Sequence, residues 1–179
     1  MPKDNQTLEN LAALLQRSGA RAIIAASGLP SPAIYDFDYR TAIIGLAFQR
    51  FSNPVGVSGH RRMSAARLKL LQFATMRPGM IRVIAEWSKE KSQTPLALRY
   101  SVRMRHAFLS DTAHDDMMKL LIACGIFERD GAQLVSGSKM QSLSKIVETI
   151  QQNELFTDER AAIAALSEIK VTNDMLEGW

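Results

Sequence analysis

Residues 110–137 constrain the fold more than any other part of the chain. They read SDTAHDDMMKLLIACGIFERDGAQLVSG. Asp111 or Thr112 can cap a helix by accepting a hydrogen bond from its first turn, and Gly125 can end that helix. Between these positions, apolar side chains recur at the spacing of a buried helix face: Met117, Leu120, Leu121 and Cys124. We therefore expect an amphipathic helix here, with Cys124 as a buried and inert thiol.

Two short apolar segments after this helix predict a β-hairpin. Residues 126–129 and 132–135 flank Asp130-Gly131, a dipeptide favoured in the type I′ turns that join paired strands. Upstream, the apolar residues of segment 96–104 alternate with small or charged residues, which is the pattern of a half-buried strand. A strand, a helix and a hairpin in this order predict a winged-helix module over residues 93–138.

The charge of this predicted module is unusual for a protein that reads DNA. The exposed start of its helix carries Asp115 and Asp116, and Lys119 alone compensates them. Phosphates repel carboxylates at short range, so this helix is a poor candidate for the major groove. Asp115 and Asp116 are instead expected to contact a partner protein.

Helical spacing predicts most of the remaining chain. We expect helices over residues 7–17, 63–76, 80–91, 139–152 and 157–169, and loops over residues 28–34 and 52–59. A further helix is expected to start after a cap at Asp36 or Asp38 and to end near Phe51. The predicted fold class is mainly α with a small β part. Its regions are a helical N-terminal half (1–92), the winged-helix-like module (93–138) and C-terminal helices (139–179), in one compact domain or in two that share a core.

The positive charge of the chain is concentrated in its middle third. Residues 60–105 hold eleven lysines and arginines against Glu86 and Glu90, whereas residues 106–179 hold six against twelve acidic residues. A basic region of this strength attracts polyanions such as double-stranded DNA through long-range attraction and counterion release. The alternative is that these cations are solvated or pair with the acidic C-terminal third.

Basic side chains of this segment are candidates for contacts with the DNA backbone: Arg61, Arg62, Lys69, Arg77, Arg99, Arg103 and Arg105. For the arginines of the predicted strand, protection of a sheet edge against aggregation is the alternative role.

Three further residues are candidates for contacts with a partner protein. Arg67 falls inside the apolar arc of its helix, so it extends to the rim, pairs with an acidic group or points into a partner. Trp87 lies in the helix over residues 80–91. Trp179, at the end of the sequence, is either docked on the core or an exposed anchor.

The sequence contains no pattern that predicts an enzyme. His60, His106, His114 and Cys124 lack the spacing of metal ligands, and the HExxH, GxSxG and Cys-x-x-Cys motifs are missing. We therefore expect no catalytic residue, no metal and no cofactor. One cysteine, no signal-peptide pattern and no apolar run near the ~20 residues of a membrane helix predict a cytoplasmic protein that does not contact membranes.

The order of three segments resembles a known class of proteins over most of the chain. The segments are YDFDYRTAIIGLAFQRFS (35–52), GHRRMSAARLKLLQFATMRP (59–78) and DMMKLLIACGIFERDGAQLVSG (116–137). This order is similar to the small middle components of bacterial three-component defence systems built around an SMC- or Rad50-like ATPase, such as Lamassu. The resemblance implies a non-catalytic subunit that docks on the coiled-coil ATPase through winged-helix surfaces, in the manner of kite proteins. A nuclease or other effector would be a separate chain.

The expected function is therefore that of an adaptor or regulatory subunit in anti-phage or anti-plasmid defence. It would dock on the ATPase and add a basic surface to DNA binding within the complex. The alternative is a free-standing winged-helix transcription regulator that dimerises and reads base edges. The acidic helix start at Asp115 and Asp116 argues against this alternative.

Overall fold

The computed structural model of the protein describes residues 22–24, 30–32, 36–56, 59–90, 95–152, 154–169 and 171–176. The chain divides into two compact units, residues 1–40 and 41–179. In the first unit, β1 (Ala22–Ile24) pairs antiparallel with β2 (Pro30–Pro32). The loop predicted over residues 28–34 is therefore wrong at β2. Proline lacks an N–H group but is tolerated in edge strands, and each strand of a two-stranded sheet is an edge. The helix predicted over residues 7–17 lies outside the described residues.

Helix α2 (Phe37–Phe51) begins close to its predicted start. Asp36 caps it, because the carboxylate accepts a hydrogen bond from the backbone N–H of Tyr39 at 2.7 Å. The helix continues into the second unit, where Ile43, Ile44 and Phe48 are almost completely buried. Helical spacing predicts a core face of Tyr39, Ile43, Leu46 and Ala47, and all four are buried.

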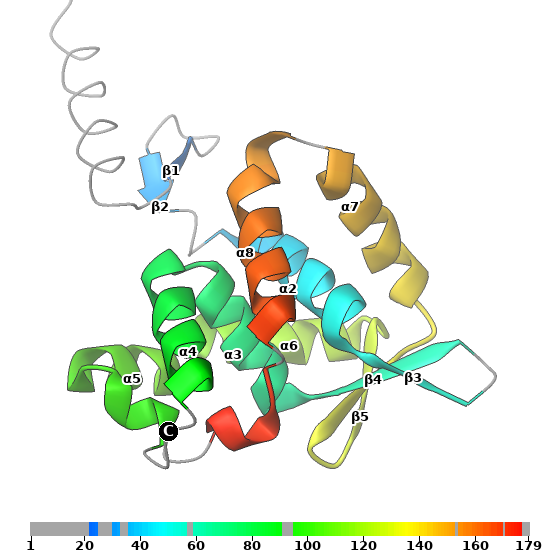
Figure 1. The fold of residues 1–179 in the computed structure, drawn as a ribbon. Coiled ribbons are helices and arrows are strands. Elements are labelled where there is room, and N and C mark those ends of the chain that lie inside the picture. The colour runs from blue at the N-terminus through cyan, green and yellow to red at the C-terminus, as the bar shows by residue number, and fades with distance from the viewer. Residues whose placement is uncertain are drawn as a thin grey trace, which may run out of the picture. The chain divides into compact units, whose positions relative to one another are not determined.

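Four strands form an antiparallel sheet in the second unit, in the order β3-β4-β6-β5 (Figure 1). The sheet combines two hairpins that lie far apart in the sequence: β3 (Asn53–Val55) with β4 (His60–Ser64), and β5 (Phe127–Asp130) with β6 (Gln133–Ser136). The prediction of a loop over residues 52–59 is wrong at β3. This edge strand has Pro54 as its middle residue and is followed by Gly56, a composition that suits a short edge strand.

The hairpin β5–β6 is confirmed, but its turn lies one residue later than predicted. Asp130 is paired with Gln133, so the two turn residues are Gly131 and Ala132. Gly131 has a φ of +58°, a conformation that a side chain disfavours. The glycine therefore supplies the turn at its first central position.

The strand predicted over residues 96–104 is wrong. The structure has a short 3₁₀-helix, η2 (Leu96–Arg99), followed by α5 (Val102–Leu109). Ser101 begins α5 as a cap, since its hydroxyl accepts a hydrogen bond from the backbone N–H of Met104 at 3.2 Å. Two short helical elements follow one another here, and each has its own buried side. The apolar residues of segment 96–104 therefore alternate in the sequence as they would in a strand. The third strand beside the hairpin is instead β4.

The helix before the hairpin is confirmed as α6 (Thr112–Ala123), with Asp111 as its cap. Cys124, however, is exposed, so the prediction of a buried thiol is wrong. Leu120 is 47% exposed as well, so the predicted buried face is confirmed only at Met117 and Leu121. The helix ends at Ala123, and Cys124 follows the last regular turn, where the apolar face no longer meets the core.

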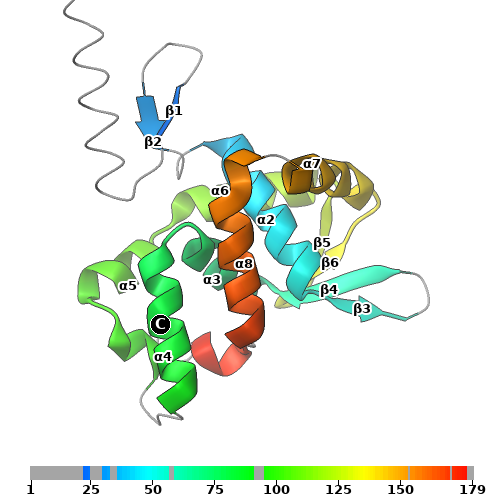
Figure 2. The same ribbon diagram turned by 45° about the horizontal axis from the view of Figure 1, so that its top comes forward.

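The remaining helices agree closely with prediction: α3 (Ala65–Thr75), α4 (Pro78–Glu90), α7 (Met140–Gln152) and α8 (Thr157–Ile169). Two short 3₁₀-helices, η3 (Glu154–Phe156) and η4 (Asn173–Leu176), flank α8. Helix α8 packs on α3 and α4, and Figure 2 shows it running alongside α4. The fold is mainly helical with a small antiparallel sheet, as predicted. None of the described helices is both long and apolar enough to cross a membrane.

The core of the second unit joins helices to the sheet through aromatic and close backbone contacts. Phe48 of α2 meets Phe127 of β5 edge to face, with ring centroids 4.8 Å apart. Helix α7 approaches α2 at Gly45, where a Cβ atom would lie 2.6 Å from Cγ2 of Val147. Only a glycine permits this approach.

Candidate nucleic-acid interface

The predicted DNA-contact residues do not share one surface. Arg61 and Arg62 lie on β4, Lys69 on α3, and Arg103 and Arg105 on α5. Helix α5 and the β3–β4 hairpin lie far apart in both views (Figures 1 and 2). The seven residues therefore fall into separate groups, and the structure uses several of them internally.

Arg61 is a structural residue of the sheet. Its Nε donates to the hydroxyl of Ser52 and its Nη2 to the carbonyl oxygen of Ser52, both at 2.7 Å. These bonds tie β4 to the residue that follows α2. The guanidinium of Arg61 is therefore used within the fold and is less available to a DNA phosphate.

Arg77 and Arg99 also have partners within the fold. The guanidinium carbon of Arg77 lies 3.6 Å from the ring centroid of Phe73, a cation–π contact, and its Nη1 donates to the carbonyl oxygen of Phe73 at 3.3 Å. Arg99 forms an ion pair with Glu90. Both cations are therefore less available to an external anion than the sequence suggested.

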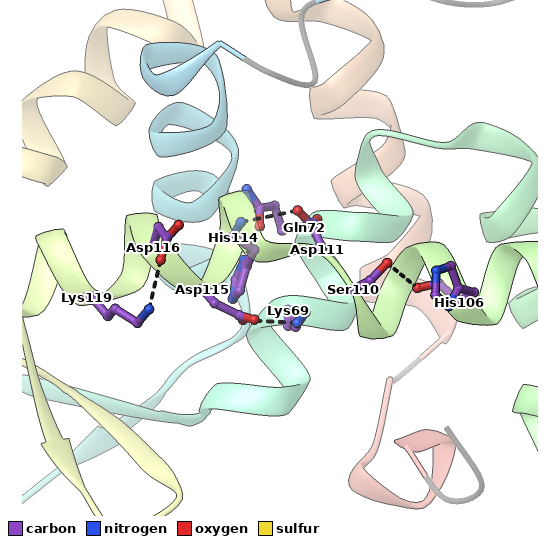
Figure 3. Close-up of polar contacts among 9 residues, drawn as sticks. All are labelled: Lys69, Gln72, His106, Ser110, Asp111, His114, Asp115, Asp116 and Lys119. Atoms are coloured by element: carbon purple, nitrogen blue, oxygen red, sulfur yellow. Dashed lines mark hydrogen bonds and ion pairs between the residues drawn. The ribbon is translucent and has the colours of Figure 1, made fainter.

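Lys69 pairs with the acidic C-terminal third, as the alternative interpretation of the charge predicted. Figure 3 shows Lys69 of α3 and Asp115 of α6 pointing toward each other, with Nζ and Oδ1 3.0 Å apart. The lysine side chain is only 16% exposed, and its Nζ also lies 5.7 Å from the ring centroid of Phe108. This pair links α3 to α6.

The second predicted partner carboxylate is also engaged. Asp116 accepts a hydrogen bond from Lys119 at 2.8 Å on the exposed side of α6, and this bond raises the pKa of Lys119 (Figure 3). The buried His114 beside them contacts Gln72 of α3 through Nδ1. The acidic start of α6 is thus partly neutralised by lysines and held against α3.

A cleft of about 350 Å³ lies beside Arg62 and Arg67. It is bounded by β3, β4, β6 and the first turn of α3, and its lining residues are Asn53, Pro54, Val55, Arg62, Met63, Ser64, Arg67 and Gln133. We call it the Arg62–Arg67 cleft. The sequence did not predict that these two arginines meet, because Arg62 and Arg67 belong to different elements.

Strand register explains how Arg62 reaches the cleft. Successive residues of a strand point to opposite faces, so Arg62 is exposed while the next residue, Met63, is buried. Asn53 of β3 is paired directly with Arg62, and Gln133 of β6 is paired with Ser64. Paired residues share a face of the sheet, which brings an arginine, two amides and a hydroxyl together.

Arg67 enters the same cleft from the first turn of α3. Ser64 caps this helix by accepting a hydrogen bond from the backbone N–H of Arg67 at 3.4 Å. The Nε atom of Arg67 is buried without a hydrogen-bond partner among the described residues. Burial lowers the pKa of the Arg67 guanidinium, because desolvation disfavours its charged form.

Within the part of the chain that the structure describes, no carboxylate pairs with the arginines of the cleft. None of the described residues that line it is acidic, and within the described part of the chain neither Arg62 nor Arg67 forms an ion pair. Glu128 of β5 lies on the same face of the sheet, but β6 separates it from Arg62. Two strand spacings separate the two backbones by roughly 10 Å, and no ion pair joins the two side chains in the described part of the chain.

A different kind of surface lies on η2 and α5. Leu98, Val102 and Leu109 are 58%, 73% and 56% exposed. Val102 and Leu109 are seven residues apart, which places them on one side of α5 two turns from each other. We call these three residues with Arg103 the α5 face. Sequence reasoning missed it because the strand pattern assigned Leu98 and Val102 to a buried side; the serine three residues before Met104 was the signal for a helix cap.

The other predicted site residues carry less information. Trp87 is half-buried on α4 and has a contact within the fold, and Trp179 lies outside the described residues. In the described part of the chain, no group of histidines, cysteines and carboxylates could hold a metal ion.

Comparison of the chain with protein-family models, curated proteins and solved structures finds no match.

Proposed function

We propose that this chain is a non-catalytic adaptor subunit of an SMC- or Rad50-like ATPase complex, with one surface for DNA and another for the ATPase. Anti-phage or anti-plasmid defence is the setting that the sequence resemblance implies. The observation that carries the proposal is that Arg62 and Arg67 remain without a carboxylate partner among the described residues, although acidic residues outnumber basic ones in the C-terminal third.

The DNA surface is the sheet side that bears the Arg62–Arg67 cleft. Arginine is suited to phosphate oxygens because its planar guanidinium can donate two parallel hydrogen bonds. Contacts to phosphates fix the position of a protein on a duplex without reading its sequence. A surface with two such groups and no neighbouring recognition helix fits a subunit that holds DNA irrespective of sequence.

The ATPase surface is the α5 face. Exposed apolar side chains on one side of a helix are typical of protein interfaces. No acidic residue occurs in η2 or α5, so the complementary surface is apolar with acidic residues around it. We propose that the coiled-coil ATPase provides this surface.

Two double variants test the surfaces against each other in the purified complex. Arg62→Glu with Arg67→Glu should weaken binding to a random-sequence duplex by at least about tenfold and leave co-purification with the ATPase unchanged. Val102→Asp with Leu109→Asp should abolish co-purification while the isolated chain keeps its own affinity for the duplex. Each variant is the control for the other.

Native purification provides the decisive negative outcome. If no large coiled-coil ATPase co-purifies with the wild-type chain from its host, the adaptor proposal fails. Sequence-specific binding of the isolated chain to a short duplex would instead support a transcription regulator.

A further inference from the structure

The Arg62–Arg67 cleft contains positive charge that no described residue neutralises. Arg67 places a guanidinium in a partly buried position where Nε has no hydrogen-bond partner among the described residues. A second guanidinium, that of Arg62, lines the same cleft. Buried charges in proteins are normally paired and hydrogen-bonded. An anion seated between the two groups would supply both the charge and the acceptors.

The neutral lining of the cleft suits an oxyanion with several acceptor atoms. Asn53, Ser64 and Gln133 contribute two amides and a hydroxyl, all of which can donate hydrogen bonds. Together with two guanidiniums they present more donors than a monovalent halide can use. A tetrahedral phosphate has enough oxygens to engage several of them at once.

The strand pairing holds these donors in fixed positions. Asn53 and Arg62 are directly paired across β3 and β4, and Ser64 and Gln133 across β4 and β6. Ser64 also caps α3, which fixes the first turn from which Arg67 projects. Binding an anion here therefore requires little ordering of the backbone, and preorganisation of this kind favours affinity.

We infer that the Arg62–Arg67 cleft is a binding site for a phosphate group, in which the two guanidiniums bind the phosphate oxygens and Asn53, Ser64 and Gln133 complete the donor set. This inference adds a ligand class to the DNA surface of the proposed function. Only the identification of the phosphate as part of a DNA backbone depends on that proposed function. A duplex backbone and a free nucleotide offer the same chemistry.

Side-chain NMR of the full chain tests the site directly. In protein labelled with ¹⁵N, the Nε–H signal of Arg67 should shift saturably as inorganic phosphate replaces chloride at constant ionic strength. Parallel titrations with adenosine monophosphate and a 12-base-pair duplex identify the source. A shift with the duplex alone assigns the site to the nucleic-acid backbone, and a shift with the nucleotide at lower concentration assigns it to a free ligand.

Lysine variants separate a formed phosphate site from general attraction. Arg67→Lys and Arg62→Lys keep the charge but lose the planar guanidinium, so each should weaken phosphate binding by at least about fivefold, followed through the Ser64 amide and the Gln133 side-chain signals. Arg103→Lys on α5 should leave the affinity unchanged. A thermal melt of each variant confirms that it folds.

The outcomes distinguish this inference from the proposed function. Equal shifts with chloride and phosphate, or equal affinities of the Arg62→Lys, Arg67→Lys and wild-type chains, would overturn the phosphate site. DNA binding by the complex could then still persist through charge alone. The converse outcome is that the wild-type chain binds phosphate at this site, while the Arg62→Glu, Arg67→Glu variant keeps the full DNA affinity of the complex. The phosphate site would then stand, but it would have no role in DNA binding.

Discussion

Neighbouring arginines of β4 have opposite roles because a strand alternates its faces. Arg61 points toward Ser52 and is used within the fold, whereas Arg62 points to the cleft. In the sequence the two are equivalent members of one basic run. A prediction of the strand and its register would have separated them; the run alone could not.

A buried tyrosine illustrates how one residue couples stability to pH. The hydroxyl of Tyr100 donates to the carbonyl oxygen of Met80 at 2.9 Å, and burial raises the pKa of Tyr100. The folded chain therefore keeps this proton at pH values where the unfolded chain, with a tyrosine pKa of about 10, releases it. This residue's contribution to stability is complete below pH ~10 and is lost as the pH rises above it.

Tyr100→Phe should reveal this contribution. At pH 8 the variant should lose about 1 kcal/mol of unfolding free energy, since the carbonyl of Met80 loses its donor. Between pH 8 and pH 11 the wild type should lose about 1 kcal/mol more than the variant does. Urea denaturation at both pH values measures the difference. An identical pH dependence in the two proteins would contradict the assignment.

Elements with local signals were predictable, and elements defined by distant partners were not. Helix α6 has its cap and its apolar face within one stretch, so its position followed from the sequence. Strand β4 pairs with β6, which lies about 70 residues later in the sequence. The residues near Arg62 contain no local pattern that predicts this pairing. The strand prediction for residues 96–104 was wrong for a different reason. Two short helical elements follow one another there, and together their apolar residues recur at every second position, as in a strand. The cleft depends on the β4–β6 pairing, so it could not be predicted either.

The contact between α2 and α7 is a sensitive point of element packing. Gly45→Ala places a methyl group where Cγ2 of Val147 lies 2.6 Å away and Cδ1 of Leu143 lies 3.0 Å away. The helices must separate, and overpacking of this kind lowers stability by about 1–3 kcal/mol. Thermal or urea unfolding measures the loss.

Gly79→Ala is the matched control for this substitution. A Cβ at Gly79, in the first turn of α4, has no atom within 4 Å. Alanine should therefore leave stability unchanged or raise it by up to ~1 kcal/mol, as expected from helix propensity. Equal losses in both variants would contradict the assignment to the α2–α7 contact, because a Cβ at Gly79 meets no such close neighbour.

At the scale of the whole molecule, the charge asymmetry of the sequence is only partly neutralised by folding. Lys69 forms an ion pair with Asp115 of the acidic C-terminal third. Arg82 and Arg99 form ion pairs with Glu86 and Glu90, which belong to the basic segment itself. The Arg82–Glu86 and Lys119–Asp116 pairs are largely exposed and contribute little to stability. The basic composition of residues 60–105 therefore predicted that some cations lack an acidic partner, as Arg62 and Arg67 do among the described residues, but it did not predict which ones.

Salt should consequently separate stability from DNA binding. Raising NaCl from 0.05 to 0.5 M should change the unfolding free energy by less than about 1 kcal/mol, because the ion pairs described are mostly exposed. Binding of the complex to a duplex should weaken steeply over the same range. The slope of log K against log salt should be less steep by about 2 in the Arg62→Glu, Arg67→Glu variant, one unit for each lost phosphate contact. An unchanged slope would remove these arginines from the DNA surface.

The pairing of β4 with β6 also has a consequence for biosynthesis. When Ser64 leaves the ribosome, its strand partner Gln133 has not been made. At ~5–20 residues per second, the nascent chain spends roughly 3–14 s with the β6-facing edge of β4 unpaired. Chaperone demand should therefore peak during translation of the intervening segment, and slow codons placed there would prolong the interval in which nascent chains can associate with one another.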